Sequence, residues 1–189
     1  MSDETSQMVE VLAEHHFQHA TADEVFDAWL NPQDVRRWMS HALAAFGLSG
    51  EIVRIEIDPR PGGAFLFSDM RDGEEMRHWG TYLTLERPSV IQCTWFTREL
   101  SERKGSSIVR IEIAPRAGGC SARLTHRMPA TFAKYTERAE QGWKTLLAST
   151  EAILQLKAGR RKTEEGRGPH PAPPPGEKED GRGERSPAM

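Results

Sequence analysis

The pattern near the carboxyl end of the chain constrains the fold most strongly. Between about Lys134 and Lys157, apolar and small residues recur with the period of one face of an α-helix. They are Ala139, Trp143, Leu146, Leu147, Thr150, Ile153 and Leu154. An α-helix rises about 1.5 Å per residue, so the segment predicts a helix roughly 35 Å long. Such a helix can cross a whole small sheet, which would cover its apolar face.

Gly142 lies inside this predicted helix, directly before Trp143. Glycine in a helix interior costs about 1 kcal/mol relative to alanine. Because glycine lacks a Cβ atom, two explanations are open. The backbone packs tightly against a strand, or the position leaves room for a ligand.

Between residues 51 and 128 the apolar residues alternate with period two, which indicates strands. Turn sequences separate the strands: Asp72-Gly73 is typical of a tight hairpin, and Arg87-Pro88 separates another pair. The string VRIEIDPRPGG at 53–63 recurs as VRIEIAPRAGG at 109–119. Proline sets φ and the glycines accept positive φ, so we interpret both strings as hairpin turns rather than phosphate-binding loops.

The segment before residue 51 predicts one strand and two short helices. Residues 8–17 alternate as a strand does, and Thr21 with Glu24 forms a capping-box pattern at a helix start. Pro32 is favoured at the first position of a second helix. Residues 40–50 are apolar without a clear period, and we expect a loop there.

Composition limits the classes of function. A chain of 189 residues, 37% hydrophobic, predicts a single domain over residues 8–158. Residues 159–189 are rich in proline, glycine and charge, and we expect a disordered tail. The formal net charge of −3 does not favour nucleic-acid binding. No apolar run approaches the roughly 18 residues of a membrane span, and the amino terminus does not resemble a signal peptide, so we expect a cytoplasmic protein.

No metal or cofactor is expected. His15, His16 and His19 lie close in sequence, but a strand would point neighbours to opposite faces and hold His15 and His19 roughly 13 Å apart. Cys93 and Cys120 lack the spacing of metal ligands.

Several strings resemble those of a known family and occur in its order. They are ADEVFDAWLNPQDVRRWM at 22–39, DPRPGGAFLF at 58–67, GTYLTLERPSVIQCTW at 80–95, ARLTHRM at 122–128 and QGWKTLL at 141–147. The chain thus resembles the START-like superfamily, in particular proteins related to the C-terminal domain of the activator of the heat-shock-protein-90 ATPase. The resemblance covers roughly residues 8–157.

The resemblance implies an α+β helix-grip fold. In it, a curved antiparallel sheet of about seven strands grips the long C-terminal helix, and two short helices follow the first strand. It also implies an apolar cavity between sheet and helix. Aromatic residues from different elements are candidates to line it, although core filling alone would also require them. The candidates are Trp38, Phe46, Phe65, Phe67, Trp79, Trp95, His126 and Trp143.

His126 is the main polar candidate among these residues. It shares a strand face with Leu124 and Met128, so it points inward, either as an acid–base group or as a structural histidine bonded to the backbone. The sequence has no nucleophile elbow and no evident carboxylate partner for it.

We therefore expect a binding module for a small hydrophobic or amphipathic molecule rather than an enzyme. The alternatives are a cyclase- or hydrolase-type enzyme that uses His126, and a co-chaperone-like regulator of an ATPase. A homodimer or another protein partner is left open.

Overall fold

The computed structural model describes residues 7–97 and 107–165. The elements follow in the order β1 (Met8–Gln18), α1 (Ala22–Leu30), α2 (Pro32–Ala45), β2 (Ile52–Ile57), β3 (Ala64–Arg71), β4 (Glu74–Glu86), β5 (Val90–Thr94), β6 (Ile108–Arg116), β7 (Gly119–Pro129), the 3₁₀ helix η2 (Ala130–Tyr135) and α4 (Thr136–Glu165). This is the predicted order of one strand, two short helices, a run of strands and a long helix.

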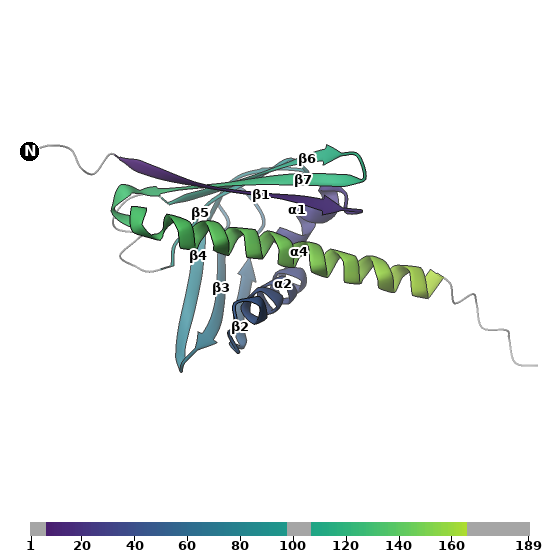
Figure 1. The fold of residues 1–189 in the computed structure, drawn as a ribbon, viewed down its shortest axis with the longest axis horizontal. Helices are drawn as coiled ribbons and strands as arrows, with labels where there is room; N and C mark the ends of the chain where they lie inside the picture. The colour runs from purple at the N-terminus through teal and green to yellow at the C-terminus, as the bar shows by residue number, and fades with distance from the viewer. Residues whose placement is uncertain (1–6, 98–106, 166–189) are drawn as a thin grey trace, which may run out of the picture.

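The seven strands form one antiparallel sheet in the order β1-β7-β6-β5-β4-β3-β2. Strands β1, β6 and β7 lie along α4, whereas β2, β3 and β4 run across it, so the sheet curves around the helix (Figure 1). The predicted α+β helix-grip fold is confirmed.

Local sequence signals explain where the first helices begin. Thr21 accepts a hydrogen bond from the Glu24 N–H, and the Glu24 side chain accepts one from the Thr21 N–H, as the capping box predicts. Asn31 caps α2 by accepting bonds from the next two N–H groups beyond Pro32.

Helix α2 is longer than the sequence suggested. The loop expected over residues 40–50 is wrong up to Ala45, because Ala42 and Leu43 are buried and continue the apolar face of the helix. They lie three and four residues beyond Met39, which is helical spacing that an alanine-rich segment obscures.

The two repeated strings form the same turn twice, as predicted. The first connects β2 to β3 and the second connects β6 to β7. Gly62 and Gly118, at equivalent positions of the two strings, have φ angles of 82° and 80°. Glycine is the residue that adopts this left-handed conformation without steric cost.

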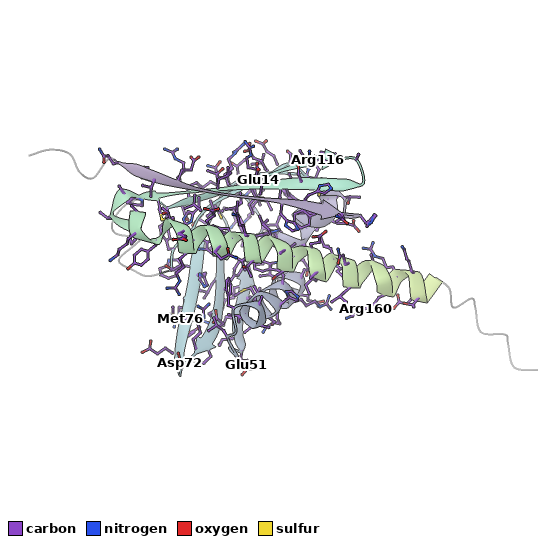
Figure 2. The ribbon with its side chains drawn as sticks, in the orientation of Figure 1. Glu14, Glu51, Asp72, Met76, Arg116 and Arg160 are labelled. Carbon is purple, nitrogen blue, oxygen red and sulfur yellow. The ribbon has the colours of Figure 1, made fainter. Side chains whose placement is uncertain are left out.

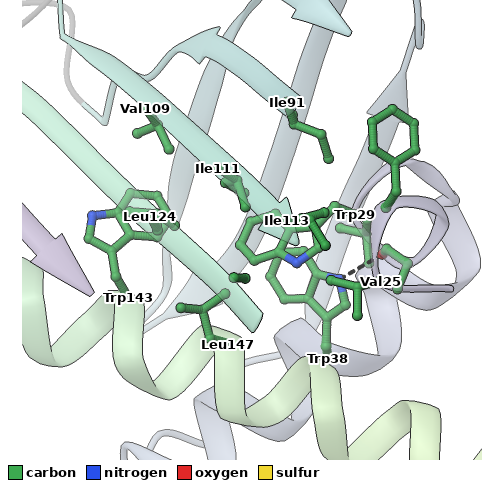
Figure 3. Close-up of a cluster of buried hydrophobic side chains, with 14 of the residues drawn as sticks. Val25, Trp29, Trp38, Ile91, Val109, Ile111, Ile113, Leu124, Trp143 and Leu147 are labelled. Atoms are coloured by element: carbon green, nitrogen blue, oxygen red, sulfur yellow. Dashed lines mark hydrogen bonds between the residues drawn. The ribbon is translucent and has the colours of Figure 1, made fainter. Parts of the chain in front are cut away.

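The core lies between the concave face of the sheet and the helices. Trp143 and Leu147 project from α4 toward Leu124 and Val109 of the sheet (Figure 3). The outer face carries charged side chains such as Glu14, which pairs with Arg123 across β1 and β7 at 2.7 Å (Figure 2).

Helix α4 continues past the predicted end at Lys157 and past the expected domain boundary at residue 158. Its last turns bury no apolar residue, and Leu156 is 58% exposed. Arg161 instead pairs with Glu24 of α1 at 2.8 Å. The apolar period therefore ends before the helix does. Most of the expected tail, residues 166–189, lies outside the described residues.

No helix within residues 7–97 and 107–165 is long and apolar enough to cross a membrane.

Candidate functional site

A small cavity lies between the sheet and the helices. Its lining residues come from α1, β3, β4, β5, β6 and the residue that follows β5: Trp29, Phe65, Phe67, Tyr82, Ile91, Cys93, Trp95, Val109 and Ile111. Its volume is about 20 Å³, which is room for about one water molecule. Three of the eight predicted residues, Phe65, Phe67 and Trp95, line it.

The aromatic rings around the cavity contact one another. The Phe65 ring centroid lies 5.0 Å from that of Phe67, 5.3 Å from Tyr82 and 5.4 Å from Trp95. Such tilted contacts at about 4.5–7 Å are favourable aromatic geometries. The lining is thus largely an aromatic wall built by neighbouring strands.

Trp38 packs against two residues of this wall, Trp29 and Phe67, without lining the cavity itself. Its ring lies 4.9 Å from Trp29 and 6.2 Å from Phe67, and its Nε1 donates to the Ala28 carbonyl at 2.9 Å (Figure 3). The side chain is 1% exposed and does not line the cavity. Its hydrogen bond fixes the angle between α1 and α2, and so the position of Trp29.

Trp143 connects the cavity wall to His126. The Trp143 ring lies 4.9 Å from Trp95, and its Nε1 donates to His126 Nδ1 at 3.1 Å. An indole N–H can only donate, so Nδ1 is the accepting nitrogen. The proton of the neutral imidazole is therefore on Nε2, which donates to Ser107 Oγ at 2.7 Å.

These two hydrogen bonds indicate a structural role for His126. The side chain is buried, and burial lowers the pKa of His126 to about 4, so the ring is neutral near neutral pH. Both ring nitrogens have partners. A general base needs a free accepting nitrogen next to the substrate proton, and here Trp143 occupies that nitrogen.

A second histidine, His78, also lies beside Trp95. The His78 ring is 5.6 Å from the Trp95 ring, and the Nδ1 atom is buried without a hydrogen-bond partner among the described residues. Burial, as the largest cause, lowers the pKa of His78 to about 4. His78 therefore places a neutral polar group beside the aromatic wall.

One buried carboxylate lies on the same face of the sheet. Asp69 of β3 is fully buried and accepts two bonds from Arg71, at 2.5 Å from Nε and 3.1 Å from Nη2. The guanidinium neutralises the carboxylate charge. Neither residue lines the cavity.

Two sequence candidates lie away from the cavity. Trp79 follows His78 in β4 and faces the opposite side of the sheet, where its ring lies 6.2 Å from Phe96. Phe46 caps the carboxyl end of α2 and is 44% exposed.

Sequence reasoning missed six of the nine lining residues, among them the aromatic residues Trp29 and Tyr82. Trp29 lies on the buried apolar face of α1, a place that indicates core packing alone, although a buried tryptophan also carries a polar N–H that needs a partner. Tyr82 lies two residues beyond Gly80, on the strand face that His78 shares. The alternation of inward and outward residues along this strand was the sequence signal that could have identified Tyr82 as a lining residue.

The lining holds one unsatisfied polar atom. Trp29 is 6% exposed, and its Nε1 is buried without a hydrogen-bond partner among residues 7–97 and 107–165. Within the same residues, no group of three or more His, Cys, Asp or Glu side chains could hold a metal ion.

The chain matches a family model described as Activator of Hsp90 ATPase homolog 1-like protein over residues 19–155. A protein of unknown function, SA2116 from Staphylococcus aureus, is 16% identical, with a TM-score of 0.66 over 81% of this chain and 97% of that chain. Protein CV1439 from Chromobacterium violaceum is 23% identical, with a TM-score of 0.60 over 76% and 95%.

An AHSA1-like protein from Aeromonas hydrophila is 17% identical, with a TM-score of 0.63 over 79% of this chain and 94% of that chain. At these identities the structural likeness establishes the shared fold. No curated protein matches the chain.

Proposed function

This chain belongs to the family of Activator of Hsp90 ATPase homolog 1-like proteins, and we propose that its domain binds a small hydrophobic or amphipathic molecule between the sheet and α4. The observation that carries the proposal is the meeting of aromatic side chains from α1, β3 and β4, together with Trp95, on one cavity. Concave, mostly apolar sites with few polar groups are the usual form of small-molecule sites.

The cavity must widen to admit such a molecule. A volume of about 20 Å³ holds one water, whereas small-molecule sites are commonly about 300–1,000 Å³. The ligand therefore displaces side chains when it enters. The way α4 is held indicates which side chains move.

The middle of α4 is fastened by polar contacts. Glu151 accepts bonds from His15 Nε2 at 2.7 Å and from the Gln18 N–H at 2.8 Å. Ser149 Oγ is bonded to His41 Nδ1 at 2.9 Å. These bonds tie the middle of the helix to β1 and α2.

The first two turns of α4 have a weaker attachment. From Thr136 to Gly142 no side chain is fully buried, and Trp143 is the first that is. Trp143 also contacts Trp95 of the lining. Withdrawal of Trp143 with the first turns of α4 would widen the cavity beside Trp95 and leave the rest of the helix in place.

A fluorescent neutral probe, N-phenyl-1-naphthylamine, tests the proposal. We expect a saturable one-to-one rise of probe fluorescence with the wild-type protein. Val109→Phe fills the cavity from a position that is 2% exposed and abolishes the rise. Val53→Phe makes the same change at a position that is 40% exposed and retains it.

Circular dichroism of each variant checks folding. Wild-type binding by a folded Val109→Phe variant would place the probe elsewhere, and a wild-type protein without saturable binding would contradict the proposed function.

A further inference from the structure

We propose that the molecule bound in this cavity is uncharged and carries a hydrogen-bond acceptor, such as a carbonyl oxygen, that accepts the N–H of Trp29. This inference rests on the proposed function and narrows it to a class of ligand. It depends on the unsatisfied indole, on the absence of charge in the lining and on the shape of the aromatic wall.

The indole of Trp29 differs from the other buried indoles that face the core. Trp38 Nε1 donates to the Ala28 carbonyl, and Trp143 Nε1 donates to His126. Trp29 is also buried, but its Nε1 has no partner among the described residues. A buried donor without a partner lowers stability, so such a group in a folded protein calls for an explanation.

The position of Trp29 supplies that explanation. Of these three tryptophans, Trp29 is the one that lines the cavity. A water molecule held there would need two or more polar partners, and the lining offers few. An oxygen atom of a ligand needs only one hydrogen-bond donor there. The rest of the ligand, an aromatic ring, would be held by contacts with Phe65 and Trp95 of the lining.

The electrostatics of the lining select against a charged ligand. None of the nine lining residues carries a charge, since burial raises the pKa of the Tyr82 hydroxyl and of the Cys93 thiol. The nearby carboxylate of Asp69 is already neutralised by Arg71. A charged ligand would lose its hydration and gain no counter-ion.

The expected ligand is therefore a neutral, flat and mainly aromatic molecule with a carbonyl or an equivalent acceptor. Its ring lies against Phe65 and Trp95, and its oxygen points toward α1. A carboxylate of the same shape is excluded because it would bring an uncompensated charge into this site.

Three small molecules of nearly equal shape test this inference on the full chain: acetophenone, α-methylstyrene and benzoate. The first has a carbonyl oxygen, the second has a CH₂ group in its place, and the third is charged near neutral pH. The readout is the set of indole N–H signals from the five tryptophans in a ¹H–¹⁵N spectrum. Trp29→Phe assigns the signal of interest.

We expect acetophenone to move the Trp29 indole proton downfield, as a new hydrogen bond does. Saturating α-methylstyrene should leave that proton without a downfield shift. Benzoate should leave the Trp29 and Trp143 signals unchanged near neutral pH. These shifts are measured on the wild-type protein, so they decide the question even if a Trp29 variant folds poorly.

Affinities give a second measurement. The ratio of acetophenone to α-methylstyrene affinity cancels the effect of cavity size, and Trp29→Phe should lower it about three- to tenfold. Trp79→Phe, on the opposite face of the sheet, serves as the matched control and should leave the ratio unchanged.

An unchanged ratio in Trp29→Phe, or equal Trp29 shifts with both neutral probes, would overturn the inference while the cavity function stands. Tighter binding of benzoate than of acetophenone would overturn the requirement for an uncharged ligand. Absence of binding by all three also overturns the inference, and the proposed function falls with it only if N-phenyl-1-naphthylamine fails as well.

Discussion

His126 and Trp143 show how single residues decide the chemistry of this interior. The sequence placed His126 on an inward strand face and left open whether it acts as an acid–base group or as a structural one. The hydrogen bond from Trp143 occupies the nitrogen that a base would use. Burial keeps the ring neutral, so its contribution to the protein lies in stability and in the position of Trp143.

The free energy of unfolding should therefore fall as the pH falls from about 6.5 to about 4. In the unfolded chain a histidine binds a proton near pH 6.5, whereas burial holds the pKa of His126 in the folded chain at about 4. Between these values the unfolded state binds more protons. A pKa difference of this size corresponds to a loss on the order of 3 kcal/mol for His126.

Urea unfolding at several pH values measures this dependence. His126→Gln should reduce the slope in that window without abolishing it, because burial also lowers the pKa of His78 to about 4. His16→Gln, at an exposed position, serves as the control and should leave the slope unchanged. An equal slope in wild type and a folded His126→Gln variant would contradict the assignment.

Helix α4 combines two kinds of attachment to the domain. Trp143 and Leu147 bury apolar surface, while Lys157 and Arg161 hold the later turns through ion pairs with Asp34 and Glu24. Periodicity detects the first kind alone. This is why the sequence predicted a helix that ends at Lys157, whereas the helix continues to Glu165.

Gly142→Ala should stabilise the protein by about 0.5–1 kcal/mol. Of the two explanations left open for Gly142, tight packing against a strand is wrong, because a Cβ atom there would meet nothing within 4 Å. Alanine then gains helix propensity without a clash. The opposite case is Gly80→Ala, whose Cβ would lie 1.9 Å from the Thr94 carbonyl oxygen.

Thermal unfolding of both variants gives the comparison. We expect Gly80→Ala to lose about 1–3 kcal/mol from overpacking. A destabilised Gly142→Ala variant would show that the position is constrained by a contact absent from this structure.

Lys157→Met should cost about 1–2 kcal/mol of unfolding free energy, because it leaves Asp34 with less compensation. The Asp34 side chain is 5% exposed and bonds Lys157 Nζ at 2.7 Å, while Lys157 is 37% exposed, which reduces the loss. Lys144→Met is the matched control. Its pair with Glu140 is exposed on both sides, and its loss should stay below about 0.5 kcal/mol. Equal losses would contradict the distinction.

At the scale of the whole molecule, the sequence predicted the architecture well. Alternation between residues 51 and 128 predicted the strands, and the two repeated turns predicted two hairpins, all of which are present. The long helix and the capping box at Thr21 were also correct. These features depend on local period and turn chemistry, which a single sequence records directly.

Local periodicity and turn chemistry could not predict the cavity. Period two places Phe65 and Phe67 on the inward face, but it does not say how closely side chains from five elements approach each other. Whether a cavity of about 20 Å³ forms depends on displacements of side chains by less than the size of a methyl group. Trp29 was missed because its ring fits the apolar face of α1, and nothing in that pattern shows that its N–H lacks a partner among the described residues.

The disordered tail was expected from residue 159, but residues 159–165 belong to α4. Beyond Glu165 it stays a prediction, and truncation tests it. A chain that ends at Glu165 should keep the free energy of unfolding of the full chain within about 0.5 kcal/mol. A chain that ends at Ala158 also loses the exposed Arg161–Glu24 pair and should be weaker by up to about 1 kcal/mol. A larger loss on removal of residues 166–189 alone would give that segment a part in the fold.

Native mass spectrometry of the purified full chain, followed by denaturing extraction, tests the binding of a small molecule most directly. We predict a retained neutral molecule with an aromatic ring and a carbonyl or equivalent acceptor, absent from Val109→Phe and present in Val53→Phe. A molecule that the Val109→Phe variant also retains would contradict binding in this cavity. A retained carboxylate would contradict the requirement for an uncharged ligand.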